Sequence, residues 1–300
     1  MIFSVCVIVL GCTSNNSSVS DTDDTVYLQS LLDSPEPIIL IPSRKTPWIT
    51  RPLSVHTFNK IIIFEKGCRV YAKKGAFLDV EDCLIEIGNC FNVLIIGNGA
   101  LLKMCKNDYE SEPYRKGQWR HGISIKNSKN ISVEGLTVSS TGGDGIYIGQ
   151  KSSEEVCENI VLKNLALGNN YRQGISVISV KNFLMEGCRV FGTDGNLPMA
   201  GIDFEPNSNV YGYTGCLIKN CSFTDNSGSG IQVYLKKMER TQIPVEIMIE
   251  NTKSRNNNIS VAVFEVPENV RGLIRFSGCT ISGMKWIQVP KSFSVVIAQP

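Results

Sequence analysis

The chain has 300 residues, 42% of them hydrophobic, and its 30 basic and 28 acidic side chains give a net charge of +2. This length and apolar content support a substantial core in a single domain. No Lys/Arg run with interleaved aromatic residues suggests nucleic-acid binding, and no apolar run of 18 or more residues suggests a membrane-spanning helix.

The N-terminal segment predicts export. Residues 1–10 are an apolar run, Val9-Leu10-Gly11-Cys12 resembles a bacterial lipobox, and residues 13–25 form a tether rich in Ser, Asn and Asp. We therefore expect a signal peptide over residues 1–12, lipid on the Cys12 thiol, and a place in the bacterial cell envelope, in the periplasm or on the outer-membrane surface. The alternative is an ordinary buried N-terminal strand. A signal peptide has a basic n-region, and its absence here leaves open a start codon further upstream.

Beyond the tether, two short strand patterns repeat with a period of 23 to 30 residues. One pattern begins with Gly-Ile, at Gly122, Gly145, Gly174, Gly201 and Gly230, with a weaker echo at Ser260. The other has apolar residues at alternate positions, and it begins at Asn92, Asn130, Asn159, Asn182, Gly215 and Leu273. Units this short cannot bury a core alone, whereas stacked coils enclose one between them.

The repeat predicts an all-β fold, a right-handed parallel β-helix over residues 26–300. A propeller needs longer blades, and a β-sandwich does not produce identical patterns at a fixed offset. The link from the second pattern to the next Gly-Ile strand is usually 10 residues but is 14 between Gly187 and Gly201. Further insertions occupy residues 149–158, 206–214 and 235–245, and long loops on a solenoid usually carry binding.

The cysteines are predicted to be core residues rather than disulfide partners. Four of the 11 fill the slot occupied by Leu136 and Leu165 in other coils, where cysteine acts as a small hydrophobe: Cys68, Cys188, Cys221 and Cys279. A Cys188–Cys221 bridge is possible on spacing alone, but it would strain a parallel stack.

The most informative motif is the strand Gly201-Ile-Asp-Phe-Glu, which places two acids where other Gly-Ile strands carry Ser, Tyr or Gln. Residues i and i+2 of a strand face the same side, about 6.5 to 7 Å apart, so Asp203 and Glu205 should project together. Asp144 lies two coils away, roughly 9.6 Å at sheet spacing, and is a reserve acid. Glycoside hydrolysis needs such a pair, and mutual repulsion should raise one pKa.

Polar and aromatic side chains are expected to converge on the same outward face and to bind several sugar units. The guanidinium of Arg172 could bind a carboxylate or sulfate of an acidic glycan through two hydrogen bonds. The predicted binding residues are Trp119, Arg120, His121, Tyr147, Tyr171, Arg172, Gln173, Gln232 and Tyr234. Other interpretations remain open for the acids, because outward acids are often only solvated, and Asp203 with Glu205 could instead hold calcium.

The chain resembles the pectate-lyase-like superfamily of right-handed β-helix proteins, in particular bacterial repeat proteins that often act on plant or algal polysaccharides. The resemblance covers about residues 55–290, and its more specific signals are Trp119-Arg-His-Gly, Gly143-Asp-Gly-Ile, Arg172-Gln-Gly-Ile and Ala200-Gly-Ile-Asp-Phe-Glu-Pro-Asn207. Gly143-Asp144-Gly145 is similar to the aspartate-bearing strand entry of polygalacturonases, without their full aspartate set or Arg-x-Lys. The acid-x-acid strand is similar to that of iota-carrageenases, and Arg172 beside two acids imitates the calcium and base arrangement of pectate lyases.

The leading hypothesis is a glycoside hydrolase that uses Asp203 and Glu205, with Asp144 in reserve and no required cofactor. The alternatives are a polysaccharide lyase, in which Arg172, His121 or Tyr147 abstracts the proton and calcium assists, and a non-catalytic glycan-binding protein. The expected partner is a polysaccharide or oligosaccharide. If Arg172 binds an anionic group, this glycan is acidic or sulfated. We expect a monomer with no nucleic-acid partner, held at the membrane through its lipid anchor only.

Overall fold

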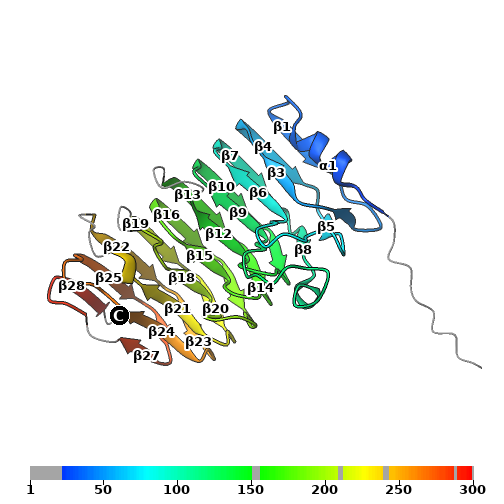
Figure 1. The fold of residues 1–300 in the computed structure, drawn as a ribbon. Helices are drawn as coiled ribbons and strands as arrows, with labels where there is room; N and C mark the ends of the chain where they lie inside the picture. Colours follow the sequence, from blue (N-terminus) through cyan, green and yellow to red (C-terminus); the bar gives the residue numbers. More distant parts are fainter. Residues whose placement is uncertain (1–21, 151–155, 209–211, 239–242, 287–288, 299–300) are drawn as a thin grey trace, which may run out of the picture.

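The computed structural model describes residues 22–150, 156–208, 212–238, 243–286 and 289–298, and it forms an elongated stack of β-coils (Figure 1). Each coil contributes one strand to each of three parallel sheets, here named A, B and C. The strands of the next coil then pair with those of the coil before it. The predicted single-domain parallel β-helix is therefore confirmed. Cys12 and most of the predicted tether lie outside the described residues.

Every described strand belongs to one of these three sheets. Sheet A contains β1 (Ile38–Ile41), β4 (Phe58–Phe64), β7 (Phe91–Ile96), β10 (Lys129–Glu134), β13 (Cys157–Lys163), β16 (Val180–Glu186), β19 (Tyr213–Lys219), β22 (Val245–Glu250), β25 (Gly272–Ser277) and β28 (Phe293–Ala298). Sheet B contains β2 (Trp48–Thr50), β5 (Arg69–Ala72), β8 (Leu101–Lys103), β11 (Thr137–Ser139), β14 (Ala166–Gly168), β17 (Arg189–Phe191), β20 (Ser222–Thr224), β23 (Lys253–Arg255) and β26 (Thr280–Ile281). Sheet C contains β3 (Leu53–Val55), β6 (Ile85–Gly88), β9 (Ile123–Lys126), β12 (Ile146–Gly149), β15 (Ile175–Val177), β18 (Ile202–Phe204), β21 (Ser229–Tyr234), β24 (Ile259–Phe264) and β27 (Met284–Trp286).

The Gly-Ile repeat builds sheet C. The isoleucine that follows each glycine pairs in register with its counterpart one coil away and is almost fully buried: Ile123, Ile146, Ile175, Ile202 and Ile231. Burying one such side chain contributes about 1.5 to 3 kcal/mol, so the stack is a major source of stability. The same register aligns the outward positions in one row: Ser124, Tyr147, Ser176, Asp203 and Gln232.

Asparagines bind one another along the start of sheet A. The side-chain amide of Asn92 donates to Asn59 at 2.9 Å, and the chain of bonds continues through Asn130, Asn159 and Asn182 at 2.7 to 2.8 Å. All five have φ between 54° and 60°, a left-handed conformation that asparagine tolerates better than most residues. The repeated asparagine thus serves both the turn and the contact between coils.

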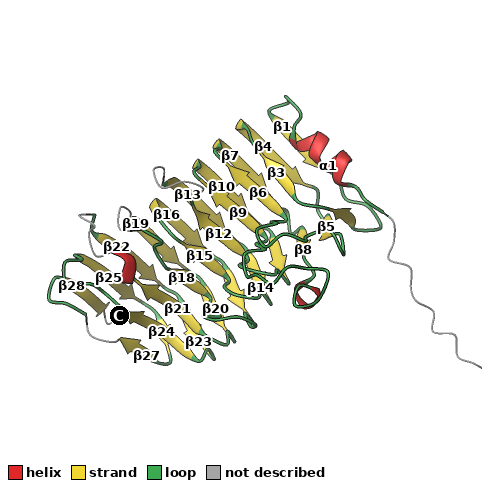
Figure 2. Ribbon diagram, in the orientation of Figure 1, coloured by secondary structure: helices red, strands yellow, loops and turns green. Residues whose placement is uncertain are grey.

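A helix covers the first coil, although the sequence showed no helical periodicity of useful length. Helix α1 (Thr25–Leu32) buries Leu28 and Leu32 against the core, while two short 3-10 helices, η1 (Lys106–Asp108) and η2 (Lys236–Met238), lie in loops (Figure 2). Asp24, within the predicted tether, pairs with Arg44 and accepts the amide of Ile49. Within the described ranges, each helix is too short or too polar to span a bilayer.

The cysteine prediction is confirmed for the described residues. Cys68, Cys188 and Cys221 are buried in the core, Cys279 packs at its margin, and all nine described cysteines are free thiols. Burial against backbone carbonyls, rather than cross-linking, explains their position: the Cys279 thiol donates to Ile249 O at 3.3 Å.

Candidate active site

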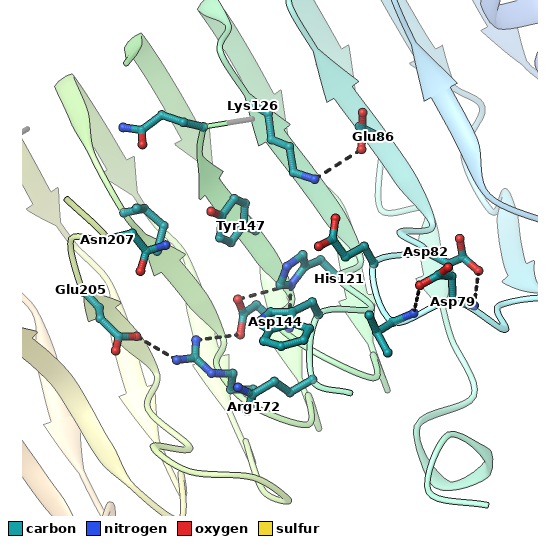
Figure 3. Close-up of a pocket in the computed structure, with 16 residues that line it drawn as sticks. Asp79, Asp82, Glu86, His121, Lys126, Asp144, Tyr147, Arg172, Glu205 and Asn207 are labelled. Carbon is teal, nitrogen blue, oxygen red and sulfur yellow. Dashed lines mark hydrogen bonds and ion pairs between the residues drawn. The ribbon is translucent and has the colours of Figure 1, made fainter. Parts of the chain in front are cut away.

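A groove of about 880 Å³ crosses the outward face of sheet C between β6 and β18. One wall is formed by the loop between β5 and β6, which contributes residues 79–82, and by the loop between β8 and β9, which contributes Gln118 and Trp119. Asp144, Tyr147, Arg172 and Glu205 line the groove from successive coils (Figure 3). Two predicted acids and several predicted binding residues therefore share one cavity.

Asp144 lies at the floor of this groove because its turn packs tightly against the preceding coil. A Cβ on the adjacent Gly143 would meet Gln118 O at 2.7 Å and Arg120 N at 2.9 Å, so glycine is required there by close approach. Only 1% of the Asp144 side chain is exposed, and neither carboxyl oxygen has a hydrogen-bond partner in the described part of the chain. Burial raises the Asp144 pKa to about 7, although Arg172 opposes this shift.

His121 lies directly beside Asp144. Its Nδ1 atom is 3.2 Å from Asp144 Oδ2 and accepts the backbone N–H of Asp144 at 3.1 Å. The imidazole stacks on the Tyr147 ring with the centroids 4.8 Å apart. Burial, together with the charges of Lys126 and Arg172, lowers the His121 pKa well below its ordinary value, so this histidine is neutral at pH 7.

Arg172 connects two acids across the groove. Its Nη2 atom donates to Glu205 Oε2 at 2.8 Å, and its Nη1 atom lies 3.8 Å from Asp144 Oδ1 (Figure 3). Burial opposes the charge on Arg172, but Asp144 and Glu205 outweigh it and raise the guanidinium pKa. Arg172 is therefore a permanent cation that the two acids share.

Asp203 occupies a different environment from the one predicted. It faces outward from sheet C, yet it is completely buried and does not line the groove. Its Oδ2 atom accepts hydrogen bonds from Gln173 at 2.6 Å and Gln232 at 3.0 Å, while Oδ1 has no partner among the described residues. Burial and the nearby Glu205 raise the Asp203 pKa to about 8. Glu205, just beyond β18, is the member of the acidic strand that reaches the groove.

Several predicted binding residues have other contacts. Arg120 is buried, so its predicted contact with substrate is wrong: its guanidinium donates to the carbonyls of Phe77, Leu78 and Arg115 and lies over Tyr109. Four more lie outside the groove lining. Gln173 and Gln232 hold Asp203, Tyr171 packs against Gly195, and Tyr234 contacts Phe264.

The sequence interpretation missed the loops that form the groove wall and the Lys126–Glu86 ion pair, with 3.4 Å between Nζ and Oε2. The spacing contained a signal for one loop, because Gly97 to Gly122 is 25 residues where other coils need 10. Among the described residues, no three His, Cys, Asp or Glu side chains are grouped as a metal site.

The arrangement combines carboxyl groups in different protonation states. Asp144, Asp203 and Glu205 share one cation, Arg172, so simultaneous ionisation of all three is unfavourable. Asp144 and Asp203 retain protons near neutral pH, whereas Glu205 forms an ion pair. A proton donor and a carboxylate on either side of an arginine can support acid and base chemistry.

The family model for the right handed beta helix region matches residues 94–285, and the chain belongs to this family. The fold is similar to that of a polygalacturonase from Erwinia carotovora ssp. carotovora, with a TM-score of 0.50 and 12% identity over 92% of this chain and 94% of that one. At this identity the likeness concerns the fold alone.

Two proteins of Bacillus subtilis (strain 168) match part of the chain. YclG is 27% identical over 128 residues, which are 40% of this chain and 22% of YclG. The SPbeta prophage-derived YorA is 23% identical over 163 residues, which are 49% of this chain and 28% of YorA. The matched region thus spans about a quarter of these longer relatives.

Proposed function

We propose that the protein hydrolyses glycosidic bonds of a polysaccharide or oligosaccharide in the groove on sheet C. The observation that carries this proposal is the placement of Asp144 and Glu205 on either side of Arg172, with Asp144 able to retain a proton near pH 7. The fold shared with a polygalacturonase supports an enzyme acting on carbohydrate. The sequence favoured Asp203 with Glu205; the groove favours Asp144 as the partner of Glu205.

In this mechanism, protonated Asp144 gives its proton to the glycosidic oxygen as the bond from that oxygen to the anomeric carbon breaks. Glu205 either removes a proton from the attacking water or itself attacks the anomeric carbon, and a water then releases the sugar. Arg172 holds Glu205 in place, and Tyr147, stacked on His121, lines the groove beside these residues. Because only 1% of the Asp144 side chain is exposed, a neighbouring side chain must rotate before a sugar oxygen reaches it.

Digestion of a polysaccharide panel tests the proposal. A hydrolase generates new reducing ends without ultraviolet absorbance, whereas a lyase generates an unsaturated, absorbing sugar. Absorbing products, or binding without cleavage of any glycan on the panel, would contradict hydrolysis. The matched catalytic variants are Asp144→Asn and Glu205→Gln, with Asp225→Asn, an exposed acid outside the groove lining, as the control.

We also propose that Cys12 carries lipid and anchors the protein in the bacterial cell envelope. The lipobox-like sequence and the polar residues after it support this proposal. Cys12→Ala should abolish labelling by a fatty-acid analogue and release the protein from membranes. Cys6→Ala, in the same apolar run, is the matched control, and unchanged labelling of the Cys12 variant would refute the anchor.

A further inference from the structure

The described lining of the groove is strongly acidic. Six carboxyl groups line it, against two cations, Lys126 and Arg172. The neutral His121 adds no positive charge. The acids are Asp79, Glu81, Asp82, Glu86, Asp144 and Glu205. Asp144 retains its proton near neutral pH, so the other five carry the negative charge.

Neither cation is available to bind an anionic sugar. Lys126 pairs with Glu86 at 3.4 Å, and Arg172 pairs with Glu205 at 2.8 Å. Each of the two cationic side chains is only 13% exposed. An anionic glycan would have to draw Lys126 or Arg172 away from its carboxylate, and separating such a pair in a partly buried site costs several kcal/mol.

The acids of the β5–β6 loop are differently placed. Asp79 pairs with Arg115 at 3.3 Å on the exposed surface, where such pairs contribute little. Glu81 and Asp82 make no ion pair with any described residue, although both line the groove. Figure 3 shows Asp79 and Asp82 at the end of the groove opposite Glu205. Arg115 and the buried Arg120 offset part of this charge, but three acids face two arginines here, and Glu81 is exposed without an ion pair among the described residues.

A second observation also points to an absent ligand. Asp144 is fully buried and lines the same groove. Apart from His121 Nδ1, to which a protonated Oδ2 can donate, its carboxyl oxygens have no hydrogen-bond partner in the described part of the chain. The buried Nε2 atom of Gln150, also in the lining, has no hydrogen-bond partner among the residues that the structure describes, which break off after Gln150 and resume at residue 156. Buried polar groups are usually satisfied, so a polar ligand that supplies donors and acceptors fits this cavity.

We propose that the groove binds a glycan that bears protonated amino groups and rejects uronic-acid and sulfated glycans, with Glu81 and Asp82 contacting an ammonium-bearing sugar. This inference rests on the proposed function of the groove and names its substrate class. It reverses the expectation of an acidic substrate, because that expectation relied on Arg172, which the structure shows already paired.

Calorimetric binding of three hexasaccharides tests the inference. The probes are glucosamine hexamer, N-acetylglucosamine hexamer, which removes the charge from the same backbone, and galacturonic acid hexamer. The protein is the full chain carrying Asp144→Asn, to prevent turnover, at pH 6 and low ionic strength. The glucosamine hexamer should bind about tenfold more tightly than its acetylated counterpart, and added salt should reduce this advantage. The galacturonic acid hexamer should bind most weakly.

Two charge-matched double variants locate the effect. Glu81→Gln with Asp82→Asn should reduce the glucosamine advantage at least threefold and leave the acetylated hexamer unaffected. Asp225→Asn with Glu268→Gln removes the same charge from exposed positions elsewhere and should change neither affinity. Equal affinity for the two glucosamine-type hexamers, tightest binding of galacturonic acid, no binding of any probe, or equal effects of both double variants would overturn the inference.

Cleavage by the wild-type chain separates this inference from the proposed function. Release of reducing ends from polygalacturonate would support hydrolysis and overturn the charge preference. Preferential binding of the glucosamine hexamer without cleavage of any glycan would support the preference and overturn hydrolysis.

Discussion

His121 Nδ1 lies within hydrogen-bonding distance of two groups on Asp144, its backbone N–H at 3.1 Å and its Oδ2 atom at 3.2 Å. Because Nδ1 accepts the backbone proton, it has no proton of its own to give to Oδ2. An ionised Oδ2 would therefore face a nitrogen lone pair, whereas a protonated Oδ2 could donate to it. This contact favours the neutral acid, in agreement with the raised Asp144 pKa.

The first prediction concerns the pH dependence of turnover. If Asp144 is the proton donor, kcat should fall as the pH rises through about 7, because the carboxyl loses its proton there. Asp144→Asn should lower kcat by about 10² to 10⁴. Initial rates between pH 5 and 9 check both effects. An alkaline limb that persists in the Asn variant, with kcat unchanged, would rule out Asp144 as the donor.

The second prediction concerns stability. The folded-state pKa of Asp203, about 8, exceeds its ordinary value of 3.8, so between these pH values the folded chain binds more protons than the unfolded chain. The free energy of unfolding therefore falls as the pH rises. Asp203→Asn should raise it by on the order of 3 to 5 kcal/mol at pH 8 and change it little near pH 4. Urea unfolding at both pH values measures the difference. An equal effect at the two pH values would show that the titration of Asp203 does not affect stability.

The third prediction concerns Arg172. Its charge lowers the Asp144 pKa, so Arg172→Gln should move the alkaline limb of kcat to higher pH while lowering kcat at least about tenfold through loss of the Glu205 contact. Arg172→Lys is the matched control because it keeps the positive charge but loses the bidentate guanidinium geometry. The alkaline limb of its kcat profile should stay at nearly the same pH as in the wild type. Identical limbs in the wild type and the Gln variant would contradict this electrostatic role.

The sequence predicted the fold because the same residue types recur at equivalent positions of successive coils. The Gly-Ile spacing identified sheet C, and the alternating pattern identified sheet A. Sheet B was missed because its strands have two to four residues and as few as one buried position, as in Arg189–Phe191. Helix α1 was missed because only Leu28 and Leu32 of its eight residues are buried, which is too little periodicity to recognise.

The candidate site was predicted less completely than the fold. Strand alternation correctly directed Asp203 outward, but it carried no information that Gln173 and Gln232 would cover the carboxyl. In the loop before Gly122, no periodicity distinguishes the buried Arg120 from Trp119, which is 45% exposed. Direction along a strand follows from local geometry, whereas burial of an outward side chain depends on neighbouring coils and loops.

The fourth prediction tests the structural role of Arg120. Its three hydrogen bonds, of 2.7 to 3.0 Å, join the β5–β6 loop to the segment around Arg115. Arg120→Met should leave those carbonyls unsatisfied and lower the free energy of unfolding by about 3 kcal/mol or more. The exposed Arg115→Met variant should cost less than about 1 kcal/mol. Equal urea midpoints for the two variants would contradict the assigned role.

The final prediction concerns the asparagine contacts along sheet A. Asn159 donates to Asn130 at 2.7 Å, accepts from Asn182 at 2.8 Å, and has a φ of 55°. Asn159→Ala removes both hydrogen bonds and places a Cβ-bearing residue in the left-handed region without a compensating polar side chain, so it should cost about 2 to 3 kcal/mol. Asn159→Gly loses the same bonds but tolerates the backbone, and it should be about 1 kcal/mol less damaging. Urea unfolding of both variants separates the loss of the hydrogen bonds from the backbone strain. If the Gly and Ala variants had the same free energy of unfolding, the whole effect would come from the lost hydrogen bonds.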